Sequence, residues 1–523
     1  HEMKVVKTEL GKYFNLPNPG LDNFLDRTEE GNPDDYRTPF WDKAPRQDIV
    51  QAWEEVVTSS EEVNLMEGLL RIELEQKDKV GPISIVRPFA QRRKDVENYF
   101  TLPKSNDQVR QFDGGAIKAV KRELRKGSLT PLSAANTVLD MRLNTNSGAP
   151  YFTRRSTVVE QTLQDLDNPQ YPYAAVMGGR SQAGGPTEED VKNRVVFMFP
   201  FSLNIKELMY YKPMIKAWQN DKTFAGVISL RAVEERVTAL FDTKAPDDYV
   251  INTDFEKFDQ HINPVLQDIG RHLMEYQFVR SYHSDLEQMY YQKYHIPLIC
   301  THNVTYEGPH GMGSGSGGTN ADENLQHKSL QHQAAFDAGE TLNPHSDCLG
   351  DDGLISYPGI TIEQVVSTYS SFGLELNADK QYADKHSTYY LQRYYHTNYR
   401  DGHGIMLGVY STFRALGRLL GQERFYDSSV WSPELVTLRA LSIIENTKNS
   451  PLFELFVDFV LKGDKFRLGL EIPGFFDNLD RKVEEARAVI PDLLGYTQGM
   501  EYEGRDIGIN SWRVVQYLRS LRR

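Results

Sequence analysis

Two adjacent carboxylates, Asp351 and Asp352, follow Gly350 between two short apolar stretches. Two such charges about 4 Å apart repel each other by about 4 kcal/mol at an effective dielectric constant of 20, so a bound cation would compensate them. The Gly-Asp-Asp tripeptide alone is a weak signal, because an ordinary acidic turn in solvent has the same composition. Its flanks favour a β-hairpin that carries the two aspartates in its turn.

A second acidic pair, Asp254 and Asp259, follows a β-like run earlier in the chain. Phosphoryl transfer between nucleotides uses two divalent cations about 3.5–4 Å apart, bridged by carboxylates from separate strands. Asp254, at a strand end beside the predicted hairpin, would supply that bridge with Asp351 and Asp352. Asp259 falls past the strand, and we expect it to hydrogen-bond in the ribose region, where RNA precursors carry a 2′-hydroxyl. The predicted cofactors are two Mg²⁺ or Mn²⁺ ions.

Glycines dominate residues 311–318, directly before a run of helix formers that starts at Thr319. Glycine permits positive φ and a close approach of the backbone, so this loop can press against a nascent base pair. Thr319 and Asn324 lie near the start of the helix, on neighbouring faces. A flexible linker is the alternative, although a linker rarely leads into a helix with such polar first turns.

The elements that must position these residues follow one another in a simple order. Predicted strands lie at 249–254, 347–349, 353–357 and around 389–396, and predicted helices at 46–75, 264–278, 319–338, 362–372 and in most of the chain beyond 405. This succession resembles a split βαβ, ferredoxin-like sheet with segments inserted around it.

The composition is that of a folded globular protein, with 39% hydrophobic and 25% charged residues in a chain of 523. No run of eighteen apolar residues occurs and the first residues lack the apolar core of a signal peptide, so we predict no membrane partner. The two cysteines, Cys300 and Cys348, lack CxxC spacing. This indicates a reducing compartment and argues against a disulfide framework or a structural zinc site.

The net charge of −14 disfavours a nucleic-acid partner at first sight. The charge is unevenly distributed, however. The segment from Arg87 to Lys126 contains eleven basic and five acidic residues, and residues 512–523 form a second basic stretch. Basic segments folded inward beneath an acidic exterior would suit internal channels for RNA and nucleotides. Solvated helix faces remain the alternative for each segment.

The acidic and glycine-rich elements together resemble the viral RNA-dependent RNA polymerase family. The matching motifs, in the family's order, are G (residues 145–150), F (192–200), A (254–259), B (314–319), C (350–352), D (373–380) and E (390–393). The amino-acid sequence outside these motifs, including residues 13–20, most resembles the polymerases of picobirnaviruses, a family of small double-stranded RNA viruses. One departure is that many members place a ribose-sensing Asn where this chain has Glu323, so we transfer that role to Asn324, one residue later.

The resemblance implies a role for each motif residue. Lys380 would protonate the departing pyrophosphate, although it could instead be a surface lysine beside Asp379. Arg393 would contact RNA or brace the junction of palm and thumb. The implied site residues are Asp254, Asp351, Asp352 and the Phe255 carbonyl for the metal ions; Lys192, Arg194, Asp259, Ser314, Thr319 and Asn324 for the nucleotide; and Ser147, Gly148, Gly315 and Arg393 for RNA.

The fold implied by the resemblance is α/β, with an α+β palm and largely helical surroundings arranged as a right hand. The implied divisions are an N-terminal segment that bridges fingers and thumb and closes the hand (1–90), fingers (91–248), palm (249–280 and 309–400), a fingers insertion (281–308), and a thumb with a C-terminal segment (401–523). Tyr496 and Tyr502 are candidates for stacking on a first nucleotide.

The implied partners are template RNA, nascent RNA, nucleoside triphosphates and the capsid interior, for a monomeric enzyme of the virion interior and the host cytoplasm. Small polar groups in place of an aromatic gate under the sugar, and Leu349 two residues before the paired aspartates, favour RNA synthesis over reverse transcription. Two other functions stay open, a two-metal phosphodiesterase and a non-catalytic RNA-binding or core-scaffold protein.

Overall fold

The strands that carry the aspartates lie in one antiparallel sheet. The computed structural model describes residues 2–41, 44–103, 109–167, 172–427, 429–489 and 508–522, so Tyr496 and Tyr502 lie outside the described residues. The sheet order is β7-β8-β4-β9. Its strands are β4 (Val250–Thr253), β7 (Asp347–Leu349), β8 (Asp352–Ile355) and β9 (Tyr382–Asp384). All neighbours are antiparallel, which confirms the predicted hairpin and the split βαβ order.

Three helices connect these strands, namely α11 (Pro264–Gln277), α13 (Thr319–Asp337) and α14 (Ile362–Ser371), close to the predicted ranges. Local sequence sets their starts, because Asn263 caps α11 and a capping box begins α14 at Thr361. Helix α13 is buried on every side from Ala321 to Gln331, although much of it is polar. Such a helix must satisfy its polar side chains internally.

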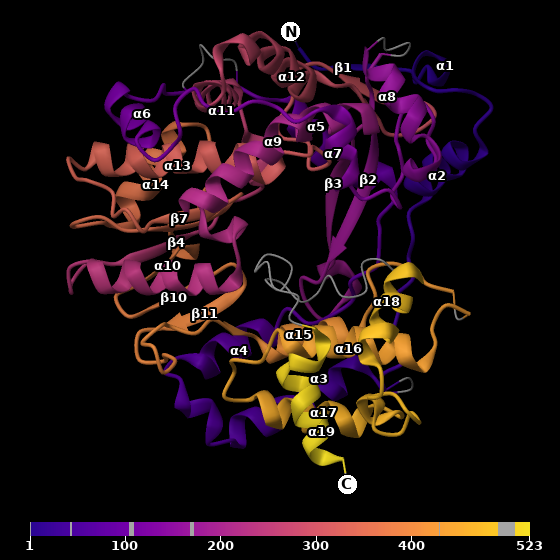
Figure 1. Cartoon of the computed structure of the whole chain (residues 1–523), viewed down its shortest axis with the longest axis vertical. Coiled ribbons are helices and arrows are strands. Elements are labelled where there is room, and N and C mark those ends of the chain that lie inside the picture. The colour runs from indigo at the N-terminus through magenta and orange to yellow at the C-terminus, as the bar shows by residue number, and fades with distance from the viewer. Residues whose placement is uncertain are drawn as a thin grey trace.

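A second sheet has five strands in the order β1-β6-β5-β2-β3. They are β1 (Lys4–Val6), β2 (Ala175–Gln182), β3 (Lys192–Met198), β5 (Leu298–Ile299) and β6 (Thr305–Glu307). Strands β2 and β3 form a long ribbon that points toward the middle of the molecule (Figure 1). Because Arg180 pairs with Arg194 and Gln182 pairs with Lys192, the end of this ribbon carries several positive charges.

Helices surround the two sheets (Figure 1). They are α5 (Phe89–Phe100), α6 (Gly114–Lys121), α7 (Ala134–Leu139), α8 (Val159–Asp167), α9 (Phe201–Asp221), α10 (Leu230–Thr243) and α12 (His283–His295). Helix α10 falls within the range predicted for the fingers. Its Val237 and Leu240 share an apolar cluster with Val250 of β4 and Leu354 of β8, so α10 packs on the four-stranded sheet.

The C-terminal part of the chain is helical, as predicted, and follows a three-stranded sheet. The elements are β10 (Ser387–Tyr390), β11 (Arg393–His396), β12 (Val409–Tyr410), α15 (Thr412–Leu420), α16 (Pro433–Glu445), α17 (Phe453–Gly463), α18 (Leu479–Val489) and α19 (Arg513–Leu521). One large apolar cluster unites these helices with the N-terminal part of the chain. In it the ring of Trp53 lies 5.2 Å from that of Phe456 and 6.5 Å from that of Phe413.

The N-terminal segment touches both ends of the molecule (Figure 1). Strand β1 pairs with β6 in the upper sheet, near α1 (Leu10–Tyr13) and α2 (Pro19–Glu30). Helices α3 (Arg46–Ser59) and α4 (Leu69–Lys77) pack with the C-terminal helices at the opposite end. The predicted helix at 46–75 is two helices, separated by residues 60–68. Gly68, whose φ of +83° few other residues adopt, directly precedes α4.

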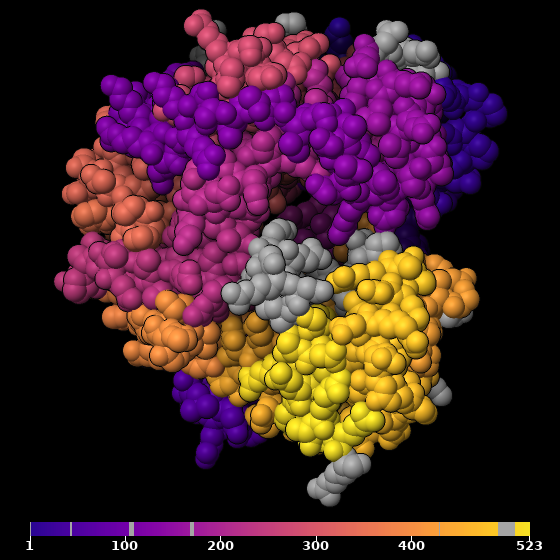
Figure 2. Space-filling model, viewed as in Figure 1, coloured from indigo at the N-terminus to yellow at the C-terminus, as the bar shows by residue number. Residues whose placement is uncertain are grey.

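The face drawn in Figure 2 is hollowed near its centre, where purple and magenta segments border the opening. The ribbon of β2 and β3 reaches toward the same central region in Figure 1. Within the described ranges, no helix has the combination of length and apolar character needed to cross a membrane.

Candidate active site

Asp254, Asp351 and Asp352 lie at one edge of the four-stranded sheet. Thr253 pairs with Gly353, so Asp254 leaves β4 where the hairpin turn carries its two carboxylates. Desolvation raises the pKa of Asp254 and of Asp351, and the charge of Asp254 raises the pKa of Asp351 and Asp352 further. The electrostatic field at this edge therefore favours a cation.

Asp352 turns both carboxylate oxygens toward the protein. Oδ1 accepts a hydrogen bond from Asn252 Nδ2 at 2.7 Å, and Oδ2 accepts one from the Leu391 amide at 2.9 Å. Burial, with the charge of Asp351 adding to it, raises the pKa of Asp352 to about 7. Among the described residues, no three His, Cys, Asp or Glu side chains converge as a preformed metal cage.

The three predicted carboxylates therefore lie close together, with Asp254 and Asp351 exposed and Asp352 hydrogen-bonded within the protein. Asp254 and Asp351 have exposed side chains and hard oxygen donors, which suit Mg²⁺ or Mn²⁺. Phe255, whose carbonyl is the other predicted ligand, fixes the chain beside them. Its ring stacks on Tyr369 with centroids 5.6 Å apart and meets the His327 ring edge at 5.3 Å.

Side chains of α13 hold the turn that carries Asp351. Asn324 Oδ1 accepts a hydrogen bond from the Gly350 amide at 2.7 Å, and His327 Nδ1 donates to the Gly350 carbonyl at 2.9 Å. Gly350 has a φ of +60°, which glycine adopts without a steric penalty. Burial lowers the pKa of His327 to about 4, so the ring is neutral at physiological pH. Asn324 is fully buried and in this conformation supports the turn, while its role toward the nucleotide stays a prediction.

Asp259 and Glu323 form a carboxyl pair beside the same turn. Glu323 is 3% exposed, and its pKa is raised first by burial and then by the charge of Asp259, to which it hydrogen-bonds. Both effects favour the protonated form of Glu323, which can donate a hydrogen bond to the half-buried Asp259. The Asp259 carbonyl accepts a hydrogen bond of 2.9 Å from the Met312 amide, which joins this region to the glycine loop.

Lys192 and Arg194 have exposed side chains on β3, on the ribbon that points to the centre. The charge of Lys192 lowers the pKa of Asp254, and the charge of Arg194 lowers the pKa of Asp351. The two predicted phosphate-binding residues are thus close enough to influence the carboxylates electrostatically. Arg180, opposite Arg194 on β2, forms an ion pair of 3.2 Å with Glu423.

Lys380, the predicted acid, forms an ion pair with Glu256. Its Nζ lies 2.7 Å from Glu256 Oε1, and this contact raises the pKa of the lysine. The neighbouring Gln381 binds the backbone of Asp254 on both sides, accepting from its amide at 2.8 Å and donating to its carbonyl at 2.9 Å. Gln381, one residue after motif D, therefore fixes the backbone position of the metal-binding candidate in motif A.

The glycine loop packs directly on β3. A Cβ atom at Gly315 would lie 1.6 Å from the Phe197 carbonyl oxygen, so only glycine fits there. Ser314 Oγ donates to the Val195 carbonyl at 3.4 Å, one residue after Arg194. Thr319 Oγ1 lies 3.1–3.3 Å from three carbonyl oxygens of residues 313–316, so this hydroxyl binds the inside of the loop.

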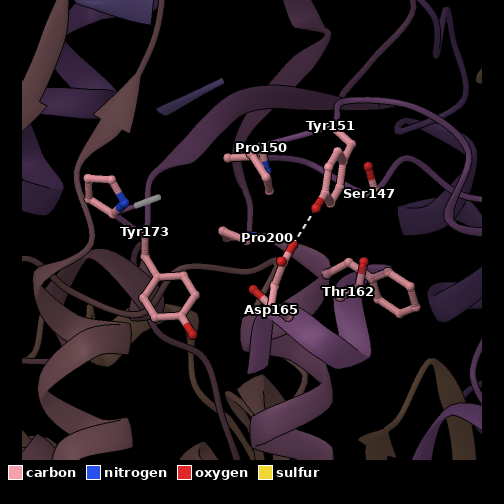
Figure 3. Close-up of a pocket in the computed structure, with 11 residues that line it drawn as sticks. Ser147, Pro150, Tyr151, Thr162, Asp165, Tyr173 and Pro200 are labelled. Carbon is pink, nitrogen blue, oxygen red and sulfur yellow. Dashed lines mark hydrogen bonds between the residues drawn. The ribbon is translucent and has the colours of Figure 1, made fainter. Parts of the chain in front are cut away.

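The motif G segment is buried where RNA contacts were expected. Ser147 is 1% exposed and its carbonyl accepts from the Phe201 amide at 2.8 Å, at the start of α9, while Gly148 is also buried. Figure 3 shows Ser147 lining a small pocket in which the Tyr151 hydroxyl donates to Asp165. In this conformation Ser147 and Gly148 hold the segment against the start of α9, and their contact with RNA stays a prediction.

Arg393 is 3% exposed and joins the three-stranded sheet to the C-terminal helices. Its guanidinium donates to Asn446 Oδ1 at 3.5 Å and lies 5.5 Å from the centre of the Tyr410 ring. This arrangement matches the bracing alternative better than contact with RNA.

Several residues of the site carry no motif and were not predicted. His327, Asn252 and Gln381 orient the turn, Asp352 and Asp254, and the charge of Lys79 from the N-terminal segment lowers the pKa of Asp254. His327 had a usable signal, because it lies three residues after Asn324 on the same helix face. Nothing in the sequence near the other three identifies them.

A family model, a relative and solved structures of known proteins all match this chain as a viral RNA-dependent RNA polymerase. A family model described as viral RNA-dependent RNA polymerase matches residues 187–404. A potential RNA-dependent RNA polymerase of human picobirnavirus (strain Human/Thailand/Hy005102/-) is 45% identical, with 99% of this chain and 100% of that protein covered. Crystal structures of a human picobirnavirus RNA-dependent RNA polymerase and of its insertion loop deletion mutant share 43% and 42% identity with this chain. Each has a TM-score of 0.89 and covers 99% of this chain and 100% of its own.

Proposed function

This chain belongs to the viral RNA-dependent RNA polymerases, as its full-length similarity to picobirnavirus relatives establishes, and we propose that it replicates and transcribes the genome of a double-stranded RNA virus. It is an RNA-directed RNA polymerase, so it acts on template RNA and nucleoside triphosphates. The observation that carries the mechanism is the sheet edge where Asp254 leaves β4 beside the turn of Asp351.

Asp254, Asp351 and the Phe255 carbonyl would hold two Mg²⁺ or Mn²⁺ ions at this edge. When bound, such ions lower the pKa of a ribose 3′-hydroxyl and neutralise the triphosphate and pyrophosphate charges. Asp352 contributes through its position, since its bonds to Asn252 and Leu391 fix the base of the turn.

Lys192 and Arg194 bind the triphosphate of the incoming nucleotide. The guanidinium offers a bidentate fork and the ammonium a point charge. Arg180 lies directly opposite Arg194, and like charges in that relation destabilise a strand pair unless anions compensate them. Glu423 compensates Arg180 in this structure, and a triphosphate between the two arginines would compensate both. We include Arg180 among the phosphate-binding residues.

Asp259 recognises the ribose by accepting a hydrogen bond from the 2′-hydroxyl, and the hydrogen bond between Glu323 and Asp259 orients its carboxylate. Ser314 and Thr319 shape the loop beside the sugar, and Asn324 acts through Gly350. Lys380 protonates the departing pyrophosphate after exchanging its partner Glu256 for a phosphate oxygen.

The remaining proposals concern the hand. The N-terminal segment (1–90) closes it, since β1 pairs with β6 at one end and α3 and α4 pack with the C-terminal helices at the other. Gly315 supports the template base, and Arg393 braces the palm against the thumb. The polymerase acts as a monomer in the capsid interior and the host cytoplasm. Limited proteolysis that removed residues 3–90 without loss of activity would contradict the closing role.

Incorporation of labelled nucleotides on a defined RNA template tests the proposed function. The full chain is expected to extend RNA, Asp351→Ala to abolish extension, and Asp247→Ala, a carboxylate with a 99% exposed side chain, to leave it unchanged. Degradation of the RNA would support a phosphodiesterase instead, and binding without extension would support a scaffold protein.

A further inference from the structure

The glycine loop at residues 313–318 needs anchors from outside itself. Ordering a backbone residue costs about 1–2 kcal/mol of conformational entropy, and glycine loses the most. Four of these six residues are glycines. Ser314 of the loop bonds to Val195 of β3, and Asn320, two residues after the loop, lies beside the Gly350 turn, where its Oδ1 would be 2.9 Å from a Cβ at Gly350. Its conformation thus bears on both the phosphate-binding strand and the carboxylates.

Helix α9 supplies the anchors. Glu207 Oε2 accepts a hydrogen bond from the Ser316 hydroxyl, and Glu207 Oε1 accepts one from the Gly317 amide at 3.3 Å. One turn earlier, Asn204 Nδ2 donates to the Gly315 carbonyl at 3.0 Å. Three consecutive loop residues are therefore bound by two side chains of one helix.

The loop backbone also packs on α9 without intervening side chains. A Cβ atom at Gly318 would lie 2.1 Å from the Tyr211 ring, and one at Gly317 would lie 3.1 Å from Leu208. The close fit leaves no room for the loop to slide along the helix. The contacts with α9 therefore determine the conformation of the loop.

Lys293 of α12 compensates the negative charge of Glu207. Its Nζ lies 3.7 Å from Glu207 Oε2 and 3.5 Å from Asp322 Oδ2, and it donates to the Tyr211 hydroxyl at 3.0 Å. The side chains of Lys293 and Glu207 have no exposed surface. Tyr290 and Tyr294 donate to Asp322, the other carboxylate of the cluster.

Burying these charges has a large desolvation cost, and well-packed apolar residues often serve stability as well or better. A cluster of this kind is therefore better explained by the geometry it enforces. Asp322 lies in the first turn of α13, directly after the loop, so Lys293 links the α9 anchor on one side of the loop to the helix on the other.

We propose that Glu207, oriented by Lys293, is a positioning residue that sets the glycine loop in the conformation that receives the template base pair and the incoming nucleotide. This inference rests on the proposed polymerase function. Glu207 acts through the loop, because its own side chain has no exposed surface. Its loss would loosen nucleotide binding first, since the carboxylates are held separately by Asn324 and His327.

Ser316→Ala and Glu207→Gln, alone and together, test the proposal. Ser316→Ala removes the loop side of the contact and leaves the Glu207–Lys293 pair intact, so it remains informative if Glu207→Gln fails to fold. Glu73→Gln is the matched control, because Glu73 is also fully buried and also accepts from a serine hydroxyl, Ser411, far from the loop in sequence. The readouts are KM and kcat for one nucleotide, thermal midpoint, and hydrogen exchange of the amides at 313–318.

Ser316→Ala and Glu207→Gln are each expected to raise the KM for the nucleotide by roughly tenfold, with a smaller change in kcat. Each should also speed hydrogen exchange of the amides at 313–318 by roughly tenfold or more. The double variant should be little worse than either single one, because both remove the same contact. Glu73→Gln should change neither KM nor loop exchange, whatever its thermal midpoint. Folded loop variants with wild-type KM and wild-type exchange would overturn the positioning role. A wild-type chain that extends no RNA would instead refute the proposed function, and loop exchange would still report on the anchor.

Discussion

The side-chain amide oxygen of Asn324 accepts a hydrogen bond of 2.7 Å from the backbone amide of Gly350. Three residues further along α13, His327 binds the carbonyl of the same glycine. Both backbone polar groups of the residue before the paired aspartates are thus held by one face of one helix. That helix begins at the end of the glycine loop, and its Asn324 and His327 hold the carboxylate turn through contacts separate from the α9 anchors of the loop.

Asn324→Ala is expected to lower kcat by roughly tenfold to a hundredfold with little change in the KM for the nucleotide. The substitution leaves the Gly350 amide without its partner, which costs about 1–3 kcal/mol for a buried donor. Steady-state incorporation kinetics measure the effect. Ser329→Ala is the control, since Ser329 is equally buried on α13 but bonds only to the Leu325 carbonyl of its own helix.

The opposite outcome would indicate that Asn324 contacts the ribose directly. In that case the variant would keep its kcat and would lose discrimination between ribonucleotides and deoxyribonucleotides.

Asp352 predicts a pH dependence of stability in the presence of a chelator. Its pKa is about 7 in the folded protein, above the value of about 3.9 in an unfolded chain, so the folded state binds the extra proton. The free energy of unfolding should therefore fall as pH rises from about 4 to about 7, by at most about 4 kcal/mol from this group. Chemical denaturation across this range measures it. Asp352→Asn should show a shallower slope, and an identical slope would refute the assignment.

Gly315→Ala should reduce kcat/KM by at least roughly tenfold. Its Cβ would lie 1.6 Å from the Phe197 carbonyl oxygen, so the loop must move away from β3. Gly114→Ala is the matched control, because its Cβ would meet no atom within 4 Å. Incorporation assays and thermal melts of both variants give the comparison. Equal activity of the two variants would show that the contact between the loop and β3 has no role in catalysis.

Arg194→Ala should raise the KM for the nucleotide by roughly tenfold or more, because it removes a charge-assisted contact to phosphate. Arg194→Lys should be intermediate, since it retains the charge and loses the bidentate fork. Arg180→Ala should also raise the KM if a phosphate lies between the two arginines. Should Arg180→Ala leave the KM unchanged while Arg194→Ala raises it, Arg180 would serve only its ion pair with Glu423.

Local pattern was enough to predict the framework of the site. Alternating and apolar residues around Asp254 and Gly350 predicted the strand and the hairpin, and the order of the elements predicted the sheet. The pairing of distant residues was not predictable in the same way. Asp352 turns inward because Leu391 offers it an amide from a strand connection that no local signal marks.

Burial explains the other differences. Asn324, Ser147 and Arg393 have the residue types of ligand-binding positions, and each is fully or nearly fully buried with a partner in the protein. Sequence gives the chemical type of a side chain, whereas the packing of α13, α9 and the C-terminal helices decides which way it faces. The resemblance to a family transfers positions more reliably than contacts.

The central claim is that Asp254 and Asp351 hold two divalent ions where RNA grows. Crystals of the full chain with template RNA, a non-hydrolysable nucleotide and Mn²⁺, measured at the manganese absorption edge, test it most directly. We predict two anomalous peaks about 3.5–4 Å apart, both within about 2.5 Å of oxygens of Asp254 or Asp351. Manganese bound elsewhere, with neither aspartate as a ligand while the nucleotide occupies the site, would contradict the account.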